Sequence, residues 1–180
     1  MKYTVVIRTL GTAGKKYQRM LESLMAQTIR PNEIIVYIAD GYTIPNETVG
    51  FERYVYVKKG MVSQRALIND DILTEYVLFA DDDLYFPPRF VESMYASLIN
   101  CKGDVISPDV FPNADRPLKN LILMTLSGRM RGRKNDKIWG YKVMRTAGYS
   151  YNMDIQNDVY LSQTNAGACF LCKKDTFFNT

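Results

Sequence analysis

Three consecutive aspartates, Asp81, Asp82 and Asp83, follow the apolar run at residues 76–80. Adjacent carboxylates repel one another and are costly to remove from water, so at the end of a buried strand they need a cation or another compensating ligand. In an extended segment Asp81 and Asp83 lie on the same side, so both can bind one hard cation while Asp82 points elsewhere. This pattern predicts a divalent metal that carries a phosphorylated substrate. A solvated acidic turn that ends the strand is the alternative interpretation.

The overall composition restricts the chemistry further. The 180 residues contain 23 basic and 19 acidic side chains, which gives a formal charge of +4. This mild surplus lacks the clustered excess that is typical of nucleic-acid-binding proteins, so we expect no nucleic-acid partner. Histidine is absent, which excludes Ser-His and Cys-His nucleophiles and histidine-ligated metals. Acid–base chemistry must therefore depend on carboxylates.

The three cysteines, Cys101, Cys169 and Cys172, show no disulfide-framework spacing and agree with a reducing compartment. Cys169 and Cys172 form a C-x-x-C pattern, but positions three apart in a strand face opposite sides, so we expect both to be structural. No stretch approaches the roughly 20 apolar residues of a membrane span, and no signal-peptide pattern follows Met1. We expect a soluble, cytoplasmic domain.

Short apolar runs alternate with helical patterns over most of the chain. The expected strands are residues 3–7, 33–38, 53–57, 76–80 and 104–107, and the expected helices are residues 15–27, 62–73 and 87–100. This alternation predicts an α/β fold with a largely parallel sheet and right-handed crossovers. The ligand site of such a sheet lies beyond the carboxyl ends of its strands, where Arg8, Thr9, Asp40 and the aspartate triplet fall.

Residues 108–151 interrupt this pattern with prolines and a basic run from Arg129 to Lys134. We expect a loop-rich insertion there, within a single domain that spans residues 1–180. A basic run is most often a solvated surface, but it can also bind phosphates, an anionic acceptor or a membrane surface. Peripheral association with the inner face of a membrane is therefore an alternative to a purely cytoplasmic location.

Several segments, taken in order, resemble the family 2 glycosyltransferases, which are GT-A-fold enzymes that use nucleotide-sugar donors. The resemblance covers most of residues 3–100 and returns near residues 163–178. It rests on residues 5–7 with Thr9, residues 21–28 with Pro31 and 33–36, Asp40 with Gly41, residues 60–65, and residues 78–83 with Pro87. Each segment is a weak signal alone, and their fixed order makes the resemblance fairly specific.

The resemblance implies a GT-A (Rossmann-like) fold, Mn²⁺ or Mg²⁺ as cofactor, and transfer of a sugar from a nucleoside diphosphate to a saccharide or lipid-linked acceptor. Inversion at the anomeric carbon and a role in polysaccharide or glycan assembly are further implications. The implied sites are a nucleotide site (Arg8, Thr9, Leu10, Asp40, Arg65, Asp82), a metal site (Asp81, Asp83) and a sugar or acceptor side (Asn165, Gly167). The chain departs from the family pattern at Arg8, Ala39 and Ala66, which affects the finer donor contacts.

The catalytic base is the component that the sequence does not supply. With no histidine present, an Asp or Glu must take the proton from the acceptor hydroxyl. In the resembled family this base follows the helix that comes after a Gly-Ala strand, and Asp154 and Asp158 precede that position. We therefore expect the chain to be the donor-binding part of a longer enzyme, with the base beyond Thr180.

Three other functions fit parts of the sequence. A haloacid-dehalogenase-type phosphatase would use Asp81 as nucleophile and Asp83 as the acid–base group, but Tyr85 stands where that motif has Thr or Val. A sugar nucleotidyltransferase needs a basic, glycine-rich loop, which residues 11–16 imitate only loosely. A nucleotide-sugar-binding module without catalytic activity is the alternative outside the enzymes.

Overall fold

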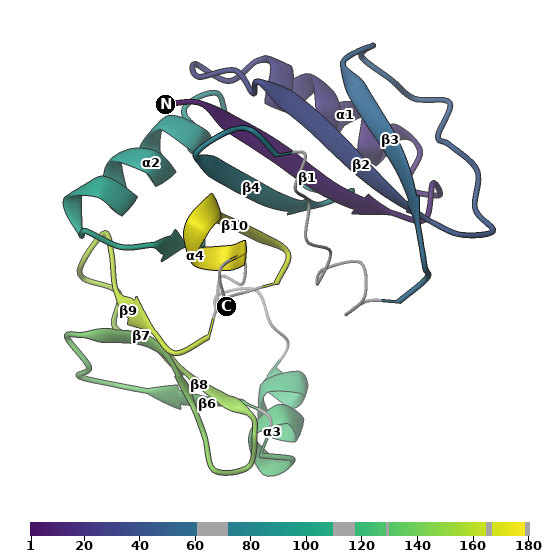
Figure 1. Ribbon diagram of the computed structural model, residues 1–180. Helices are drawn as coiled ribbons and strands as arrows, with labels where there is room; N and C mark the ends of the chain where they lie inside the picture. Colours follow the sequence, from purple (N-terminus) through teal and green to yellow (C-terminus); the bar gives the residue numbers. More distant parts are fainter. Residues whose placement is uncertain (61–71, 110–117, 129, 165–166, 179–180) are drawn as a thin grey trace. The chain divides into compact units, whose positions relative to one another are not determined.

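The computed structural model describes residues 1–60, 72–109, 118–128, 130–164 and 167–178 (Figure 1). The chain forms two compact units, of which the first comprises Met1–Pro108 with Gly167–Thr180 and the second Asp109–Ala166. This organisation differs from the expected single domain, because the middle of the chain builds a sheet of its own.

The first unit is built on a six-stranded sheet with the strand order β3-β2-β1-β4-β10-β5. The strands are β1 (Tyr3–Thr9), β2 (Glu33–Ala39), β3 (Glu52–Val57), β4 (Tyr76–Asp81), β5 (Val105–Ile106) and β10 (Cys169–Lys173). Strands β1 to β4 run parallel, whereas β10 is antiparallel to both of its neighbours. The predicted α/β class and mostly parallel sheet are therefore confirmed.

Alternate side chains of these strands enter two apolar layers on opposite faces of the sheet. Helices α1 (Lys15–Met25) and α2 (Phe90–Asn100) pack on the face that contains Val5 and Ile7. Val6, between them in sequence, belongs to the layer on the other face. The short helix α4 (Lys174–Phe178) follows β10. Most of the helix predicted at residues 62–73 lies outside the described residues.

The two cysteines of the C-x-x-C pattern occupy these two different layers. Cys169 belongs to the layer under α1 and α2, and Cys172 to the opposite one. Burial raises the pKa of each thiol to about 12. Both side chains therefore stay protonated near neutral pH and act as small apolar residues, as the sequence predicted.

A buried glutamine fixes the chain segment between the acidic residues and α2. The Gln27 side-chain amide donates hydrogen bonds to the carbonyls of Ser23 and Pro87 at 3.0 and 2.7 Å. Its oxygen accepts one from the backbone N–H of Val91 at 3.0 Å. The end of α1 is thereby connected to the start of α2.

The second unit contains helix α3 and a four-stranded sheet of order β6-β8-β7-β9. Its elements are α3 (Leu118–Leu126), β6 (Met130–Arg133), β7 (Trp139–Val143), β8 (Tyr149–Asn152) and β9 (Leu161–Ser162). The region expected to be a loop-rich insertion, residues 108–151, therefore contains one helix and three short strands among its described residues. The strands of this unit were not predicted because they have only two to five residues each and mix polar residues and glycine with a few aromatic ones, which gives no alternating apolar pattern.

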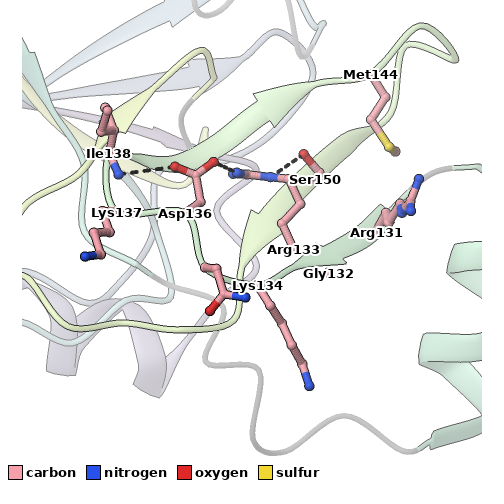
Figure 2. A pocket seen from close by; sticks show the side chains of 10 residues that line it. Arg131, Gly132, Arg133, Lys134, Asp136, Lys137, Ile138, Met144 and Ser150 are labelled. Carbon is pink, nitrogen blue, oxygen red and sulfur yellow. Dashed lines mark hydrogen bonds and ion pairs between the residues drawn. The ribbon is translucent and has the colours of Figure 1, made fainter.

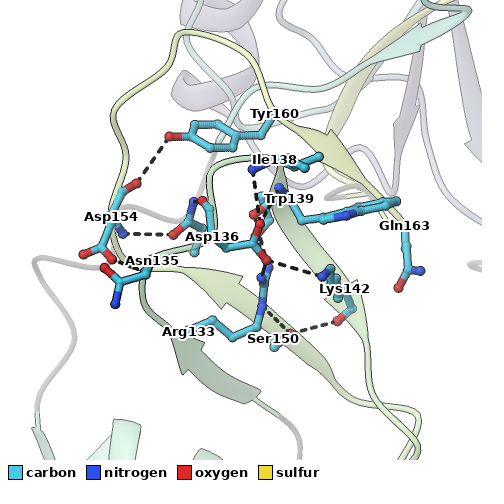
Figure 3. Close-up of polar contacts among 12 residues, drawn as sticks. Arg133, Asn135, Asp136, Ile138, Trp139, Lys142, Ser150, Asp154, Tyr160 and Gln163 are labelled. Atoms are coloured by element: carbon cyan, nitrogen blue, oxygen red, sulfur yellow. Dashed lines mark hydrogen bonds and ion pairs between the residues drawn. The ribbon is translucent and has the colours of Figure 1, made fainter.

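The Arg133 side chain of β6 forms polar contacts with β7, with β8 and with Asp136 (Figure 3). Its guanidinium donates to the Ser150 hydroxyl on β8 at 2.8 Å and to the Trp139 and Gly140 carbonyls on β7 at 3.2 and 3.1 Å. It also forms an ion pair with Asp136. One side chain of β6 therefore holds both β7 and β8.

Candidate functional site

The order of the main sheet reverses direction between β1 and β4. Strands β2 and β3 continue on one side of β1, and β4 lies on its other side. In open parallel sheets, ligands bind beyond the carboxyl ends of the strands at such a switch point. Arg8 near the end of β1 and Asp81 at the end of β4 are direct neighbours in the strand register. The residues singled out in the sequence therefore flank the switch point.

A cleft of about 550 Å³ lies at this position. Its walls come from the end of β1 and the loop after it, the start of α1, the residues after β3 and the acidic residues at the end of β4. The lining residues are Arg8, Thr9, Leu10, Thr12, Ala13, Lys16, Lys59, Gly60, Asp81, Asp82 and Asp83. The structure thus brings the predicted residues of β1 and β4 together in one cleft.

Asp81 is held by a basic side chain from the neighbouring strand. The Arg8 guanidinium forms an ion pair with the Asp81 carboxylate and also donates to the Gly167 carbonyl at 3.4 Å. The Arg8 side chain is 11% exposed and that of Asp81 is 35% exposed. Arg8 therefore balances the charge of Asp81 inside the cleft wall and connects it to the chain that leads into β10.

Asp82 and Asp83 have different partners. The Thr9 hydroxyl donates a hydrogen bond to Asp82 at 2.5 Å. The Asp83 carboxylate is half exposed, and Lys16 Nζ, on a side chain that is 72% exposed, lies 3.7 Å from it. An exposed pair at that distance is weak. Asp83 is therefore the carboxylate of the three that is held least by its surroundings.

The chain after Asp81 is not extended, unlike the extended segment that the sequence predicted for the three aspartates. The strand ends at Asp81, and Asp82 and Asp83 lie in a turn. The argument that Asp81 and Asp83 face the same side requires an extended chain, so it does not apply here. The shared role of these two residues as metal ligands stays a prediction.

The carboxylates at the end of β4 are nevertheless suitable ligands for a cation that is also bound to phosphate. Within the described ranges, no three His, Cys, Asp or Glu side chains are grouped as a metal cage. Magnesium that travels with phosphates needs only one or two protein carboxylates, because phosphate and water oxygens complete its shell. Asp83, with Asp82 beside it, meets this requirement better than Asp81, whose charge Arg8 already balances.

Other predicted residues lie outside the cleft lining. Asp40 follows β2, and its backbone N–H donates to the Val57 carbonyl at 2.8 Å, while its side chain is exposed. Gly167 is a neighbour of Arg8 through the carbonyl contact described above. Arg65 and Asn165 fall outside the described residues. Their predicted roles stay predictions.

Two lysines of the cleft were not assigned to the site from the sequence. Lys59 follows β3, and its Nζ donates to the Tyr42 hydroxyl at 2.6 Å. Lys16, near the start of α1, faces Asp83. Their positions just after a parallel strand and at the start of the helix after β1 are signals that could have found them. Both ammonium groups offer positive charge to an anionic ligand.

Gly11 allows the loop after β1 to take its observed path. Its φ is +71°, and a Cβ at this position would lie 2.3 Å from the Thr43 carbonyl oxygen. Both the left-handed backbone and the close approach require glycine. The backbone N–H of Gly11 also donates to the Thr9 hydroxyl at 2.8 Å, so the loop orients the side chain that contacts Asp82.

Comparison with known proteins identifies the fold. No protein-family model and no curated protein sequence matches the chain. The structure of residues 1–349 of S. aureus TarS aligns over 99% of this chain and 49% of that one, with 15% identity and a TM-score of 0.55. The same fragment with UDP-GlcNAc aligns over 66% and 37%, with 19% identity and a TM-score of 0.47. A 4-diphosphocytidyl-2C-methyl-D-erythritol synthase from Anaerococcus prevotii aligns over 99% and 74%, with 14% identity and a TM-score of 0.45.

The chain therefore shares its fold with TarS 1–349 and spans about half the length of that fragment. Together with the mostly parallel sheet and its flanking helices, this likeness confirms the predicted GT-A-like fold.

Proposed function

We propose that the first unit binds a nucleoside-diphosphate sugar with a divalent cation, and that the protein transfers this sugar to an acceptor hydroxyl. The observation that supports the proposal is the cleft at the β1–β4 switch point of a GT-A-like sheet, with three carboxylates in its wall. TarS 1–349 has been crystallised with UDP and with UDP-GlcNAc, so uridine nucleotides are the first ligands to test. Inversion and a role in polysaccharide or glycan assembly belong to the same proposal through the resemblance to family 2 enzymes.

The residues of the cleft have distinct parts in this proposal. Asp83 and Asp82 would hold Mn²⁺ or Mg²⁺, which when bound supplies positive charge to the departing diphosphate. Lys16 and Lys59 would bind phosphate oxygens through charge-assisted hydrogen bonds. Leu10, which is 39% exposed, offers an apolar side chain against which a nucleobase can pack.

Arg8 has a positioning part. Its guanidinium already binds Asp81 and the Gly167 carbonyl, so we assign it to shaping the cleft wall. Deprotonation of the acceptor hydroxyl needs a carboxylate base, because the sequence has no histidine. The chain spans about half of the TarS fragment. The first experiment therefore measures binding of the donor, because all of the proposed donor-binding residues belong to the first unit.

Calorimetric titration with UDP, GDP and their sugars, with and without MnCl₂, tests the proposal. We expect binding that requires the metal and weakens about tenfold or more in Asp83→Asn, because a lost carboxylate ligand lowers the affinity for the cation–diphosphate pair. Asp158→Asn, an exposed change in the second unit, should bind as the unchanged protein does. Binding that ignores both Mn²⁺ and Asp83→Asn would contradict the metal assignment. The absence of any nucleotide binding would contradict the proposal as a whole.

A further inference from the structure

Helix α3 exposes an unusual amount of apolar surface for its length. Its nine residues include Leu118, Ile122, Leu123 and Leu126, whose exposed fractions are 72, 51, 68 and 80%. Single exposed leucines are common on protein surfaces, but a cluster of large apolar side chains marks contact with a partner or a membrane. The exposed side of α3 therefore needs an apolar environment.

The same part of the chain is strongly basic. Residues 118–134 contain five Lys or Arg side chains and no Asp or Glu. Helix α3 contacts β6, so the apolar helix and the basic strand belong to one region of the second unit. Lys119 on α3, Arg131 on β6 and Lys134 just after β6 are all exposed. Apolar and cationic side chains are therefore combined over a short distance.

A cleft of about 810 Å³ lies beside β6 and is lined by Arg131, Lys134 and Lys137 (Figure 2). Figure 2 shows Arg131 and Lys134 extending away from the ion pair between Arg133 and Asp136. Across the described parts of the chain, Arg131, Lys134 and Lys137 have no ion-pair partner. Their charges are thus available to an anionic group, whereas that of Arg133 is used within the sheet.

We propose that α3 and β6 form a docking surface for an anionic lipid bilayer. The four exposed apolar side chains of α3 would enter the boundary between headgroups and acyl chains, and the cations beside them would bind lipid phosphates. At about 1.5 Å per residue, α3 is only about 14 Å long, so it would lie in the interface plane. Among the described helices, none has the length and apolar character needed to cross a bilayer.

The charges favour a bilayer over other occupants. A second copy of the chain would place the same basic segment opposite itself in a symmetric contact, and like charges facing each other are unfavourable. A soluble polyanion would use Arg131, Lys134 and Lys137 but would leave the leucines of α3 in water. A bilayer that contains anionic lipid satisfies both kinds of side chain. This inference does not depend on the donor cleft of the first unit.

Vesicle flotation tests the inference with phosphatidylcholine vesicles and with vesicles that also contain phosphatidylglycerol. We expect the protein to float with the anionic vesicles and to bind the neutral ones weakly. Leu123→Glu with Leu126→Glu removes apolar insertion, and Arg131→Glu with Lys134→Glu reverses two charges. Each pair should weaken binding to the anionic vesicles about tenfold or more.

Matched controls separate these effects from general changes in charge. Leu73→Glu with Ile99→Glu replaces two apolar residues of the first unit that are 93 and 47% exposed. Lys2→Glu with Arg30→Glu reverses two charges at exposed sites elsewhere. These controls should float as the unchanged protein does. Circular dichroism would show that each variant folds.

Two outcomes would overturn the inference. One is a failure of the unchanged protein to bind anionic vesicles. The other is binding that the leucine variant retains in full and that soluble polyphosphate abolishes, which would identify a site for a soluble polyanion instead.

Discussion

Arg8 and Asp81 face each other at the last step of the β1–β4 register, and their side chains form an ion pair. Arg8 also donates to the Gly167 carbonyl, and the Asp81 backbone N–H donates to the Ala168 carbonyl at 2.9 Å. These contacts join the ends of β1 and β4 to the segment before β10. Arg8 departs from the pattern of the resembled family, and the structure gives the residue a clear task at the switch point.

Because Asp81 forms an ion pair with Arg8, we expect Asp81 to contribute more than Asp83 to the stability of the folded protein. Asp81→Asn removes the ion pair of this carboxylate with the mostly buried Arg8 guanidinium, which should lower the free energy of unfolding by about 1–3 kcal/mol. Asp83→Asn changes a half-exposed side chain and should stay within about 0.5 kcal/mol of the unchanged protein. Urea unfolding without metal, followed by circular dichroism, measures both. Equal losses in the two variants would contradict the separate roles.

The sequence predicted the first unit well because its apolar periodicities are strong. Strands β1 and β4 are buried runs, so their carboxyl ends and the residues there could be located without a structure. The ion partner of Asp81 could not be predicted, since it depends on the register between two strands far apart in the chain. Lys16 and Lys59 are exposed polar residues with no periodic signal. The hydrogen bonds of Arg133 that join the strands of the small sheet are polar contacts, which produce no apolar pattern in the sequence.

The buried amide of Gln27 predicts a second loss of stability. Gln27→Met keeps the approximate size of the side chain but leaves the Val91 N–H without its partner. It also removes one of two donors to the Pro87 carbonyl, which keeps its hydrogen bond from the Phe90 N–H. Unsatisfied buried polar groups of this kind cost about 1–3 kcal/mol each. The urea midpoint should fall accordingly. Gln18→Met, at a half-buried position of α1 whose side-chain hydrogen bond to Glu22 lies at the surface, is the control and should shift the midpoint little. A change at Gln27 as small as that of the control would show that its hydrogen bonds are not important for stability.

The three cysteines should differ sharply in reactivity. Cys101 is exposed, whereas Cys169 and Cys172 are buried with pKa values raised to about 12. At pH 8 only about one buried thiol in ten thousand is in the reactive thiolate form. Iodoacetamide should therefore modify one thiol per folded chain and three after denaturation, as counted by mass spectrometry. In Cys101→Ser the folded protein should stay unmodified. Rapid labelling of Cys169 or Cys172 in the folded state would contradict their assignment to the core.

Because the Asp136 carboxylate is stabilised in the folded state, we expect the second unit to become less stable in acid. The pKa of its carboxyl is lowered to about 2, first by the hydrogen bond from the Trp139 backbone N–H, with further contributions from Ile138, Lys142 and Arg133. In the unfolded chain an aspartate has a pKa of about 3.9. Its stabilising effect is therefore fully present above about pH 4 and is lost as the pH falls toward 2.

Trp139 is the one tryptophan of the sequence, so its fluorescence reports on the unfolding of the second unit. Asp136→Asn should lower the unfolding temperature of this unit at pH 7, where the carboxylate is ionised and accepts all of its hydrogen bonds. Between pH 4 and pH 2 the curves of the variant and the unchanged protein should converge, because the unchanged protein loses the same ionised group by protonation. Asp158→Asn, at an exposed position of the same unit, should follow the unchanged protein at every pH. A constant offset between Asp136→Asn and the unchanged protein down to pH 2 would show that the side chain acts through its shape rather than through its charge.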